Sequence, residues 1–323
     1  MIDVLSEVLA VTRLKSTVYF SAELRAPWGI ALPRRKRSPF YVVSRGRCEI
    51  TLDDQPSSCV SLRPGDLVVL PGGAAHALAS SARAATMPLE QFVARHPMND
   101  RGHVKVLDRK GPTTSLIGGF FELERAPEPL LSILPPLIHL PGDDRGVTRW
   151  LEPILRSIAH ETAQTFPGRA VVLNRLADVL FVAAIRAHLL KLSTTDRTRS
   201  QSWLRGLTDS RIAQALAQIH NAPEEAWTLT RLASRAAMSR TAFAQRFRAL
   251  VGETPINYLA TWRMQKAAYL LEMGTMSIVD VAARVGYASE LAFAKAFRRL
   301  IGVPPGAYAR RHTRGGAEAQ RQT

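Results

Sequence analysis

The feature that most constrains this chain is a repeat in its C-terminal third. Residues 239–259, SRTAFAQRFRALVGETPINYL, align with residues 289–309, SELAFAKAFRRLIGVPPGAYA, at an offset of 50 residues, and 10 of the 21 positions are identical. The segments just upstream also correspond, at an offset of 49 residues. Self-similarity of this kind marks one supersecondary unit that occurs twice, so both copies need the same structural interpretation.

Each copy has the pattern of a helix-turn-helix unit, over residues 228–252 and 277–302. A short apolar-periodic helix is followed by a turn and then by a second helix, which a serine opens as N-cap. Apolar residues spaced i, i+4 and i+7 predict the inner face of each second helix: Phe243, Phe247 and Leu250, then Phe293, Phe297 and Leu300.

The opposite faces of these two helices carry mostly polar and cationic side chains. They are Arg240, Thr241, Ala244, Gln245 and Arg248 in the first copy, and Glu290, Leu291, Ala294, Lys295 and Arg298 in the second. Such side chains near a helix N-terminus suit the base edges and phosphates of a DNA major groove, whereas the alternative is an ordinary solvated helix face. Two matching copies favour DNA binding.

Charge and spacing agree with that interpretation. The chain has a formal net charge of +16, and residues 205–314 hold 16 Lys and Arg against 7 Asp and Glu. A basic field attracts polyanions, although it also serves solubility. Residues 255–273 between the copies predict one long helix, stiff enough to hold the two second helices about one DNA turn, near 34 Å, apart.

The first part of the chain has a different pattern. From about residue 18 to residue 140, short apolar runs alternate with turn signals such as Pro64-Gly65, which predicts an all-β barrel or sandwich. Two helices are expected over about residues 147–192, followed by a polar linker at 193–202. The helix pair is a candidate dimerisation surface, and the alternative is that its broad apolar stripe belongs to the domain core. The predicted fold class is therefore α+β with two domains, 1–192 and 203–313, and a flexible tail at 314–323.

The C-terminal domain resembles the DNA-binding domain of the AraC/XylS family of bacterial transcription regulators. The resemblance covers about residues 207–311 and includes the family's ending pattern as Ala282, Gly286, Tyr287, Ser289, Phe293, Phe297, Arg298, Gly302, Pro305 and Tyr308. It implies base contacts from Thr241, Ala244, Gln245, Leu291, Ala292 and Lys295. Since alanine and leucine side chains form no hydrogen bonds, we expect Gln245, Lys295 and Thr241 to read bases and Leu291 and Ala292 to contact thymine methyl groups.

With the flanking outer-face positions, the predicted DNA-binding residues are Ser239, Arg240, Thr241, Ala244, Gln245, Arg248, Ser289, Glu290, Leu291, Ala292, Lys295 and Arg298. The family resemblance further implies RNA polymerase as a partner, a homodimer, and activation rather than repression.

The N-terminal domain resembles the cupin-type regulatory domains of the same family. Residues 65–76, GDLVVLPGGAAH, match the second cupin motif, G-x5-P-x-G-x2-H, at every fixed place. A metal-binding cupin adds HxH and a Glu from its first motif, but no His precedes Cys59, and Tyr41 lies near the expected position. No metal, cofactor or catalytic residue is therefore predicted. His76 and Tyr41 are instead candidate contacts for an unknown small-molecule effector, and the alternative for His76 is a hydrogen-bonded residue at a strand end.

Two other functions remain open at this stage. A cupin-type metal-dependent enzyme fused to a DNA-binding module would need three or four convergent His or Glu ligands, and the sequence offers one. An effector-independent architectural DNA-binding protein would leave the first half of the chain as a scaffold. The predicted function is a ligand-responsive transcription regulator, not an enzyme, that binds double-stranded DNA.

Cysteine content and hydropathy indicate the compartment. Cys48 and Cys59 lack the spacing of a zinc site or a disulfide framework, and they are expected to be inert strand residues in a reducing environment. The longest uninterrupted apolar stretch, residues 179–185, is far shorter than the roughly 18 residues of a membrane span. A cytoplasmic protein without a membrane partner is predicted.

Overall fold

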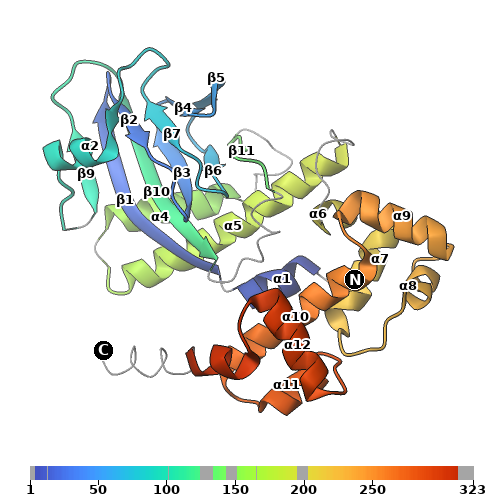
Figure 1. Cartoon of the computed structure of the whole chain (residues 1–323). Helices are drawn as coiled ribbons and strands as arrows, with labels where there is room; N and C mark the ends of the chain where they lie inside the picture. The colour runs from blue at the N-terminus through green and yellow to red at the C-terminus, as the bar shows by residue number, and fades with distance from the viewer. Residues whose placement is uncertain are drawn as a thin grey trace. The chain divides into compact units, whose positions relative to one another are not determined.

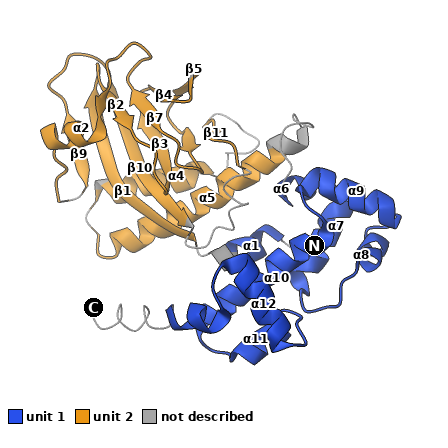
Figure 2. Ribbon diagram, viewed as in Figure 1, with its two compact units in different colours: residues 1–12, 192–323 blue, residues 13–191 orange. Residues whose placement is uncertain are grey.

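A computed structural model describes residues 4–12, 14–100, 102–123, 134–142, 151–164, 166–194 and 203–311. The chain divides into two units, a β-rich unit of residues 13–191 and a helical unit of residues 1–12 and 192–323 (Figure 2). Most of the predicted linker at 193–202 and all of the predicted tail at 314–323 lie outside the described residues.

The β-rich unit contains two mixed sheets (Figure 1). One has six strands in the order β11-β6-β3-β10-β1-β9: β1 Leu14–Arg25, β3 Ser38–Arg45, β6 Leu67–Val69, β9 His103–Val106, β10 Thr113–Leu123 and β11 Ile138–Leu140. The other has five in the order β5-β4-β7-β2-β8: β2 Gly29–Leu32, β4 Cys48–Leu52, β5 Gln55–Leu62, β7 His76–Ala79 and β8 Met87–Pro88. Neighbouring strands are antiparallel except for the parallel pairs β1–β9 and β2–β8. The described strands thus form two separate sheets, and the barrel expected from the sequence is not closed by hydrogen bonds.

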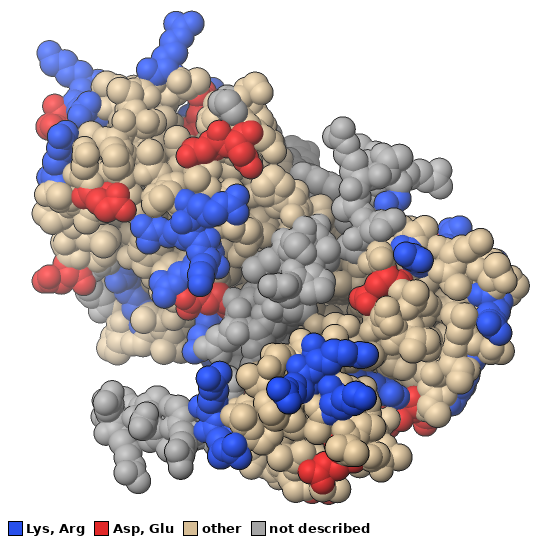
Figure 3. Space-filling model, viewed as in Figure 1, with Lys and Arg blue, Asp and Glu red and all other residues tan. Residues whose placement is uncertain are grey.

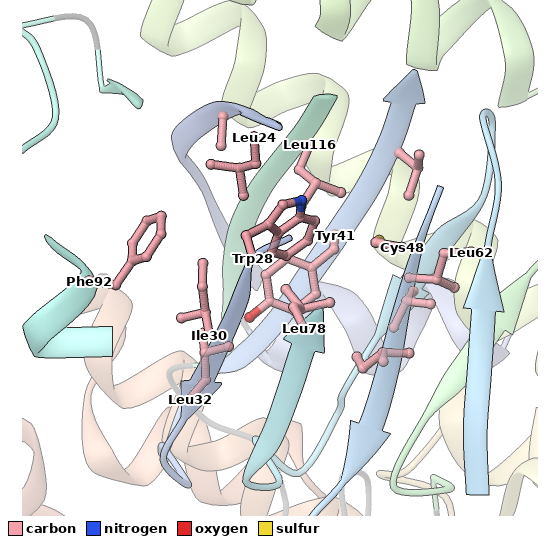
Figure 4. Close-up of a cluster of buried hydrophobic side chains, with 14 of the residues drawn as sticks. Leu24, Trp28, Ile30, Leu32, Tyr41, Cys48, Leu62, Leu78, Phe92 and Leu116 are labelled. Carbon is pink, nitrogen blue, oxygen red and sulfur yellow. The ribbon is translucent and has the colours of Figure 1, made fainter. Parts of the chain in front are cut away.

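The core of this unit lies between the two sheets. Alternate residues of each strand point inward, and Figure 4 shows Trp28, Tyr41 and Leu78 among leucine and isoleucine side chains. The outer face of the six-stranded sheet packs on helices α4, Leu151–Ala163, and α5, Arg169–Thr194, while the short helix α2 spans Leu89–Arg95. Phe121 of β10 meets the ring of Phe181 of α5 edge-on at 5.0 Å. The two helices predicted after the strands are therefore present.

The helical unit contains α1 Val4–Thr12, α6 Trp203–Gly206, α7 Ser210–Asn221, α8 Leu229–Arg235, α9 Arg240–Val251, α10 Pro255–Met273, α11 Ile278–Arg284 and α12 Glu290–Ile301. Residues 305–311 are also helical. Helix α1 contacts α7 and α10, and its residues Val4, Leu5 and Val8 are buried. The first helix of the chain thus packs within the helical unit, whereas the sequence analysis placed it with residues 13–192.

The first helix and the turn of both helix-turn-helix units follow from local sequence signals. The hydroxyls of Thr228 and Ser277 cap α8 and α11 by accepting from backbone N–H groups at 3.2 and 3.1 Å. Each turn contains one residue with positive φ, Ala237 at 50° in the first unit and Gly286 at 85° in the second. A Cβ at Gly286 would lie 2.7 Å from the Glu224 carbonyl oxygen, so glycine is needed there for space as well as for conformation.

The second helices bury the predicted phenylalanines but not the predicted leucines. Phe243, Phe247, Phe293 and Phe297 are fully buried. Leu300, however, is 41% exposed and Leu250 is half-buried, so this part of the inner-face prediction is wrong. In the last turn of each helix the residue four positions after the second phenylalanine, not the one three positions after it, faces the core. Val251 and Ile301 therefore pack inward instead.

Candidate nucleic-acid interface and effector domain

Helices α9 and α12 begin in the same way. The Ser239 hydroxyl accepts from the backbone N–H of Ala242 at 3.3 Å, and the Ser289 hydroxyl accepts from that of Ala292 at 3.4 Å. Both helices end at a left-handed glycine, Gly252 and Gly302, whose N–H bonds the carbonyl four residues earlier. The two predicted serine contacts therefore have a capping role at each helix start.

The predicted contact residues of each helix lie on its outer side. All twelve are exposed except Ala244, which is half-buried. Leu291 is the most prominent, with 81% of its surface exposed on the first turn of α12. An exposed leucine on a helix that buries both its phenylalanines has no packing role, so it is available to an apolar group such as a thymine methyl.

The cations on these faces have no ion-pair partner in the described part of the chain. Among the described acidic groups, none forms an ion pair with Arg240, Arg248, Lys295 or Arg298. Figure 3 shows Lys and Arg side chains gathered over the helical unit with few acidic side chains among them. Uncompensated cations next to exposed polar side chains favour contact with phosphates.

Other arginines of the unit have structural partners instead. Arg246 of α9 pairs with Asp209, the N-cap of α7. Arg263 of α10 donates to the Pro223 carbonyl at 2.7 Å and the Glu225 carbonyl at 2.9 Å, and its guanidinium lies 5.6 Å from the ring of Tyr287. Arg263 thus joins the loop before α8 to the turn of the second unit. Sequence analysis did not single it out, because its partners are about forty residues away in the chain.

The cupin motif has a clear structural basis in the β-rich unit. Gly65 and Gly73 have positive φ, and a Cβ on Gly73 would lie 2.0 Å from the carbonyl oxygen of Arg35. Asp66 accepts from His139 at 2.9 Å and from the backbone N–H of Gly142 at 2.8 Å. Burial alone would raise the pKa of Asp66, but these hydrogen bonds and a third from the Arg63 N–H lower it. The motif therefore fixes β6 and the segment after β11.

His76 and Tyr41, the predicted effector contacts, lie together in the core. The Nδ1 of His76 is 2.8 Å from the Ala74 carbonyl, so it carries the proton, and Nε2 accepts from the Tyr41 hydroxyl at 2.8 Å. Burial lowers the pKa of His76, which keeps the ring neutral. Cavities of about 370, 290 and 360 Å³ lie along the outer face of the six-stranded sheet, and neither residue lines any of the three. Their effector role stays a prediction.

The same pair does not fit a cupin metal centre. Both ring nitrogens of His76 already have partners, and the part of the chain that the structure describes holds no group of three or more His, Cys, Asp or Glu side chains placed to hold a metal ion. Burial raises the pKa of Cys48 to about 12, with a smaller effect of Asp66, and Cys59 lies exposed on the neighbouring strand. Cys48 is therefore a protonated thiol at neutral pH.

None of the described helices is both long and apolar enough to cross a membrane.

The fold and the exposed, capped second helices define a class of protein, a tandem helix-turn-helix DNA-binding protein with a cupin-like first domain. Comparison with known proteins agrees. Residues 3–190 match the model of the Cupin family, and residues 232–311 match that of the helix-turn-helix domain.

Relatives match over nearly the whole chain. A putative AraC-like transcription regulator of Streptomyces lividans is 33% identical over 96% of this chain and 98% of its own length. The HTH-type transcriptional regulator AlkR of Acinetobacter baylyi is 30% identical over 95% and 98%. A solved DNA-binding domain, that of AdpA in complex with a target DNA, is 34% identical over 36% of this chain and 99% of that chain, with a TM-score of 0.31. The chain belongs to the AraC-like transcription regulators with a cupin N-terminal domain.

Proposed function

We propose that α9 and α12 enter two successive major grooves of one DNA duplex. The observation that carries this proposal is the pair of serine-capped helices whose outer faces combine exposed polar side chains with unneutralised cations. Helix α10 has 19 residues and therefore spans about 28 Å, close to the rise of one DNA turn. A stiff helix of that length sets the spacing of the two half-sites.

The side chains divide into two groups by their chemistry. Gln245, Thr241 and Lys295 have donors or acceptors suited to base edges, while Leu291 and Ala292 offer apolar contact to thymine. Arg248 and Arg298 lie near the ends of their helices, where phosphates are the nearest groups of a duplex. Arg240 and Glu290 occupy the first helical position after each serine cap, beside the bases read by the first turn.

Control by a small molecule is the second part of the proposal. The β-rich unit binds an effector, and the bound effector changes the DNA affinity of the helical unit, most simply by favouring one arrangement of the protein over another. Tenfold regulation requires only about 1.4 kcal/mol of such preference. The protein then acts as an activator through RNA polymerase in the bacterial cytoplasm.

A homodimer is part of the same proposal. Helix α5 buries Leu173, Ala177 and Phe181 against the sheet, yet it exposes apolar Val172, Val179 and Leu190 along its length. Apolar side chains exposed along one helix are suited to contact a second copy. Analytical ultracentrifugation of the whole chain tests this point, and a monomer at micromolar concentration contradicts it.

Selection of binding sites from a random duplex pool tests the DNA proposal. We expect two half-sites whose centres lie about one helical turn, 10 to 10.5 base pairs, apart. Affinity falls steeply with salt, because Lys and Arg contacts to phosphate release counterions. A folded chain that shows no preference for the selected duplex over a scrambled one at any salt concentration contradicts the proposal.

A further inference from the structure

The outer face of the six-stranded sheet carries a band of polar side chains that neither the DNA interface nor the cupin motif uses. The parallel register of β1 with β9 places four of them side by side: Ser21, Glu23, His103 and Lys105. On the other side of β1, Ser115 of β10 lies opposite Glu23. The residues between them in the strands, including Ala22 and Val104, belong to the core, so the polar band faces away from it.

Helix α4 borders this band, and a partly open cavity of about 370 Å³ lies between the helix and the band. Ala159 and Thr162 of α4 line one side, and the polar residues of the sheet line the other, together with Ser44 and Asn99. Cavities of this size hold small-molecule ligands in other proteins. The helix contributes a short methyl side chain at Ala159, which leaves the space open.

The charged groups of the cavity form a dipole rather than a net charge. The Lys105 ammonium lies 3.8 Å from a Glu23 carboxylate oxygen, and the two side chains are 59% and 40% exposed. Such a long, partly open ion pair contributes little by itself, so a ligand can separate it at low cost. A net anion would meet repulsion from Glu23, and a net cation would meet repulsion from Lys105.

His103 adds hydrogen bonding without adding charge. Its Nδ1 lies 2.7 Å from the Ser21 hydroxyl, which leaves Nε2 for a ligand. Burial lowers the pKa of His103, and Lys105 lowers it further against the opposing effect of Glu23. The ring is therefore neutral at neutral pH. The cavity thus combines one anion, one cation and several uncharged donors and acceptors.

We propose that this cavity binds a small amino carboxylic acid, with the ligand ammonium on Glu23 and the ligand carboxylate on Lys105. The hydroxyls of Ser21 and Ser115 and the His103 ring complete the polar contacts, and the ligand side chain lies toward Ala159. This inference rests on the proposed effector role of the β-rich unit. It places the site on the outer face of the sheet, away from His76 and Tyr41.

Calorimetric titration of the full chain with each proteinogenic L-amino acid tests the ligand class. The amino acid that binds is then compared with its des-amino acid and its decarboxylated amine, for example 4-methylpentanoic acid and isoamylamine against L-leucine. We expect each analogue to bind at least about tenfold more weakly, because each loses one of the two ionic contacts. Absence of binding by every amino acid at millimolar concentration, or equal binding of both analogues, overturns the proposal.

Three variants test the site. Glu23→Gln and Lys105→Met remove one charge each and should weaken amino acid binding at least about tenfold. Ala159→Met fills the cavity from the helix side and should also weaken it. Glu90→Gln is the matched control, since it removes one charge from the exposed side of α2 and Glu90 does not line the cavity. Unchanged binding in the first three variants, or an equal loss of binding in Glu90→Gln, overturns the assignment.

Circular dichroism of each variant excludes unfolding as the cause of a loss. DNA affinity measured with and without the bound amino acid separates this proposal from the proposed function. If the amino acid binds at Glu23 and Lys105 without changing DNA affinity, the site stands and effector control through it fails. If a ligand of another class changes DNA affinity and the Glu23→Gln variant responds as the wild type does, effector control stands and this site is wrong.

Discussion

The two helix-turn-helix units differ on the outside and agree on the inside. The rings of Phe243 and Phe247 lie 5.7 Å apart, and those of Phe293 and Phe297 lie 5.5 Å apart. In both units a tyrosine then meets the second ring edge-on, Tyr258 at 5.9 Å and Tyr308 at 5.4 Å. The ring contacts of the interior are repeated because close packing tolerates few alternatives, while the outer faces differ at two aligned pairs of expected base contacts, Thr241 with Leu291 and Gln245 with Lys295.

The repeated tyrosine also shows where the interiors diverge. The Tyr258 hydroxyl lies 2.8 Å from Nε2 of His220, a fully buried residue of α7, whereas the Tyr308 hydroxyl donates to Glu272 of α10 at 2.5 Å. Burial, with a smaller effect of Lys266, lowers the pKa of His220 to about 3. Beside the first helix-turn-helix unit, the tyrosine thus bonds a buried histidine that resists protonation. Beside the second, the equivalent tyrosine bonds a carboxylate.

Truncation of the shared phenylalanines should have the largest effect. Phe247→Ala and Phe297→Ala each leave a cavity in a fully buried position and should lower the free energy of unfolding of the helical unit by about 3 to 5 kcal/mol. Urea unfolding followed by circular dichroism measures this, with Leu300→Ala as the exposed control expected to cost under about 1 kcal/mol. A cost in one unit but not in the other contradicts the equivalence of the two cores.

Removal of a base-reading side chain should change the DNA sequence preference of its own helix-turn-helix unit only. Gln245→Ala and Lys295→Ala should each weaken binding to the selected duplex by about 1 to 3 kcal/mol and relax base preference at one position only. The relaxed position belongs to a different half-site in each variant. Binding-site selection measures this, and a Lys295→Ala variant that returns the wild-type motif shows that Lys295 does not read a base.

Acid should destabilise the helical unit around α7 and α10, because His220 is buried there. Its folded pKa is about 3 and its ordinary value is 6.5, so between these values the unfolded chain binds a proton that the folded unit does not. The contribution of neutral His220 to the free energy of unfolding is therefore fully present above pH 6.5. It declines as the pH falls, by about 2 kcal/mol at pH ~5.

The double variant His220→Phe with Tyr258→Phe removes both hydrogen-bonding partners and should reduce this acid loss while changing stability at neutral pH little. Amide hydrogen exchange in α7 and α10 at neutral and acidic pH measures the difference. Equal acid sensitivity of the double variant and the wild type excludes His220 as the cause.

The smallest effect is expected where the two units are alike on the outside. Arg248 and Arg298 occupy equivalent places at the repeat offset of 50 residues, so Arg248→Ala and Arg298→Ala should weaken all sequences about equally. Each should also reduce the slope of log affinity against log salt concentration by about 1, because one phosphate contact is lost. Titrations of the selected and scrambled duplexes at several salt concentrations check this; a sequence-selective loss assigns a base contact instead.

Local sequence determined the helical unit. Serine and threonine before each helix, glycine after α9 and α12, and phenylalanines at helical spacing act within a few residues of one another, so the order and bounds of α8, α9, α11 and α12 could be predicted. The cupin motif was recognisable for the same reason, because its two left-handed glycines and its turn lie within residues 65–76. The hydrogen bond between the buried side chains of Tyr258 and His220 could not be predicted, since the two residues are 38 positions apart in the chain.

Only the tertiary structure decided which residues of the β-rich unit lie side by side. The pairing of Ser21 with His103 spans 82 residues and depends on a parallel register that no short pattern specifies, because a shift by one residue exchanges the two faces of a strand. The same holds for the bond between Tyr41 and His76, which brings the two candidate effector contacts together in the core. The sequence by itself therefore determined a tandem helix-turn-helix regulator, while the location of polar cavities depended on long-range strand pairing, whose register is set by the packing of the whole core.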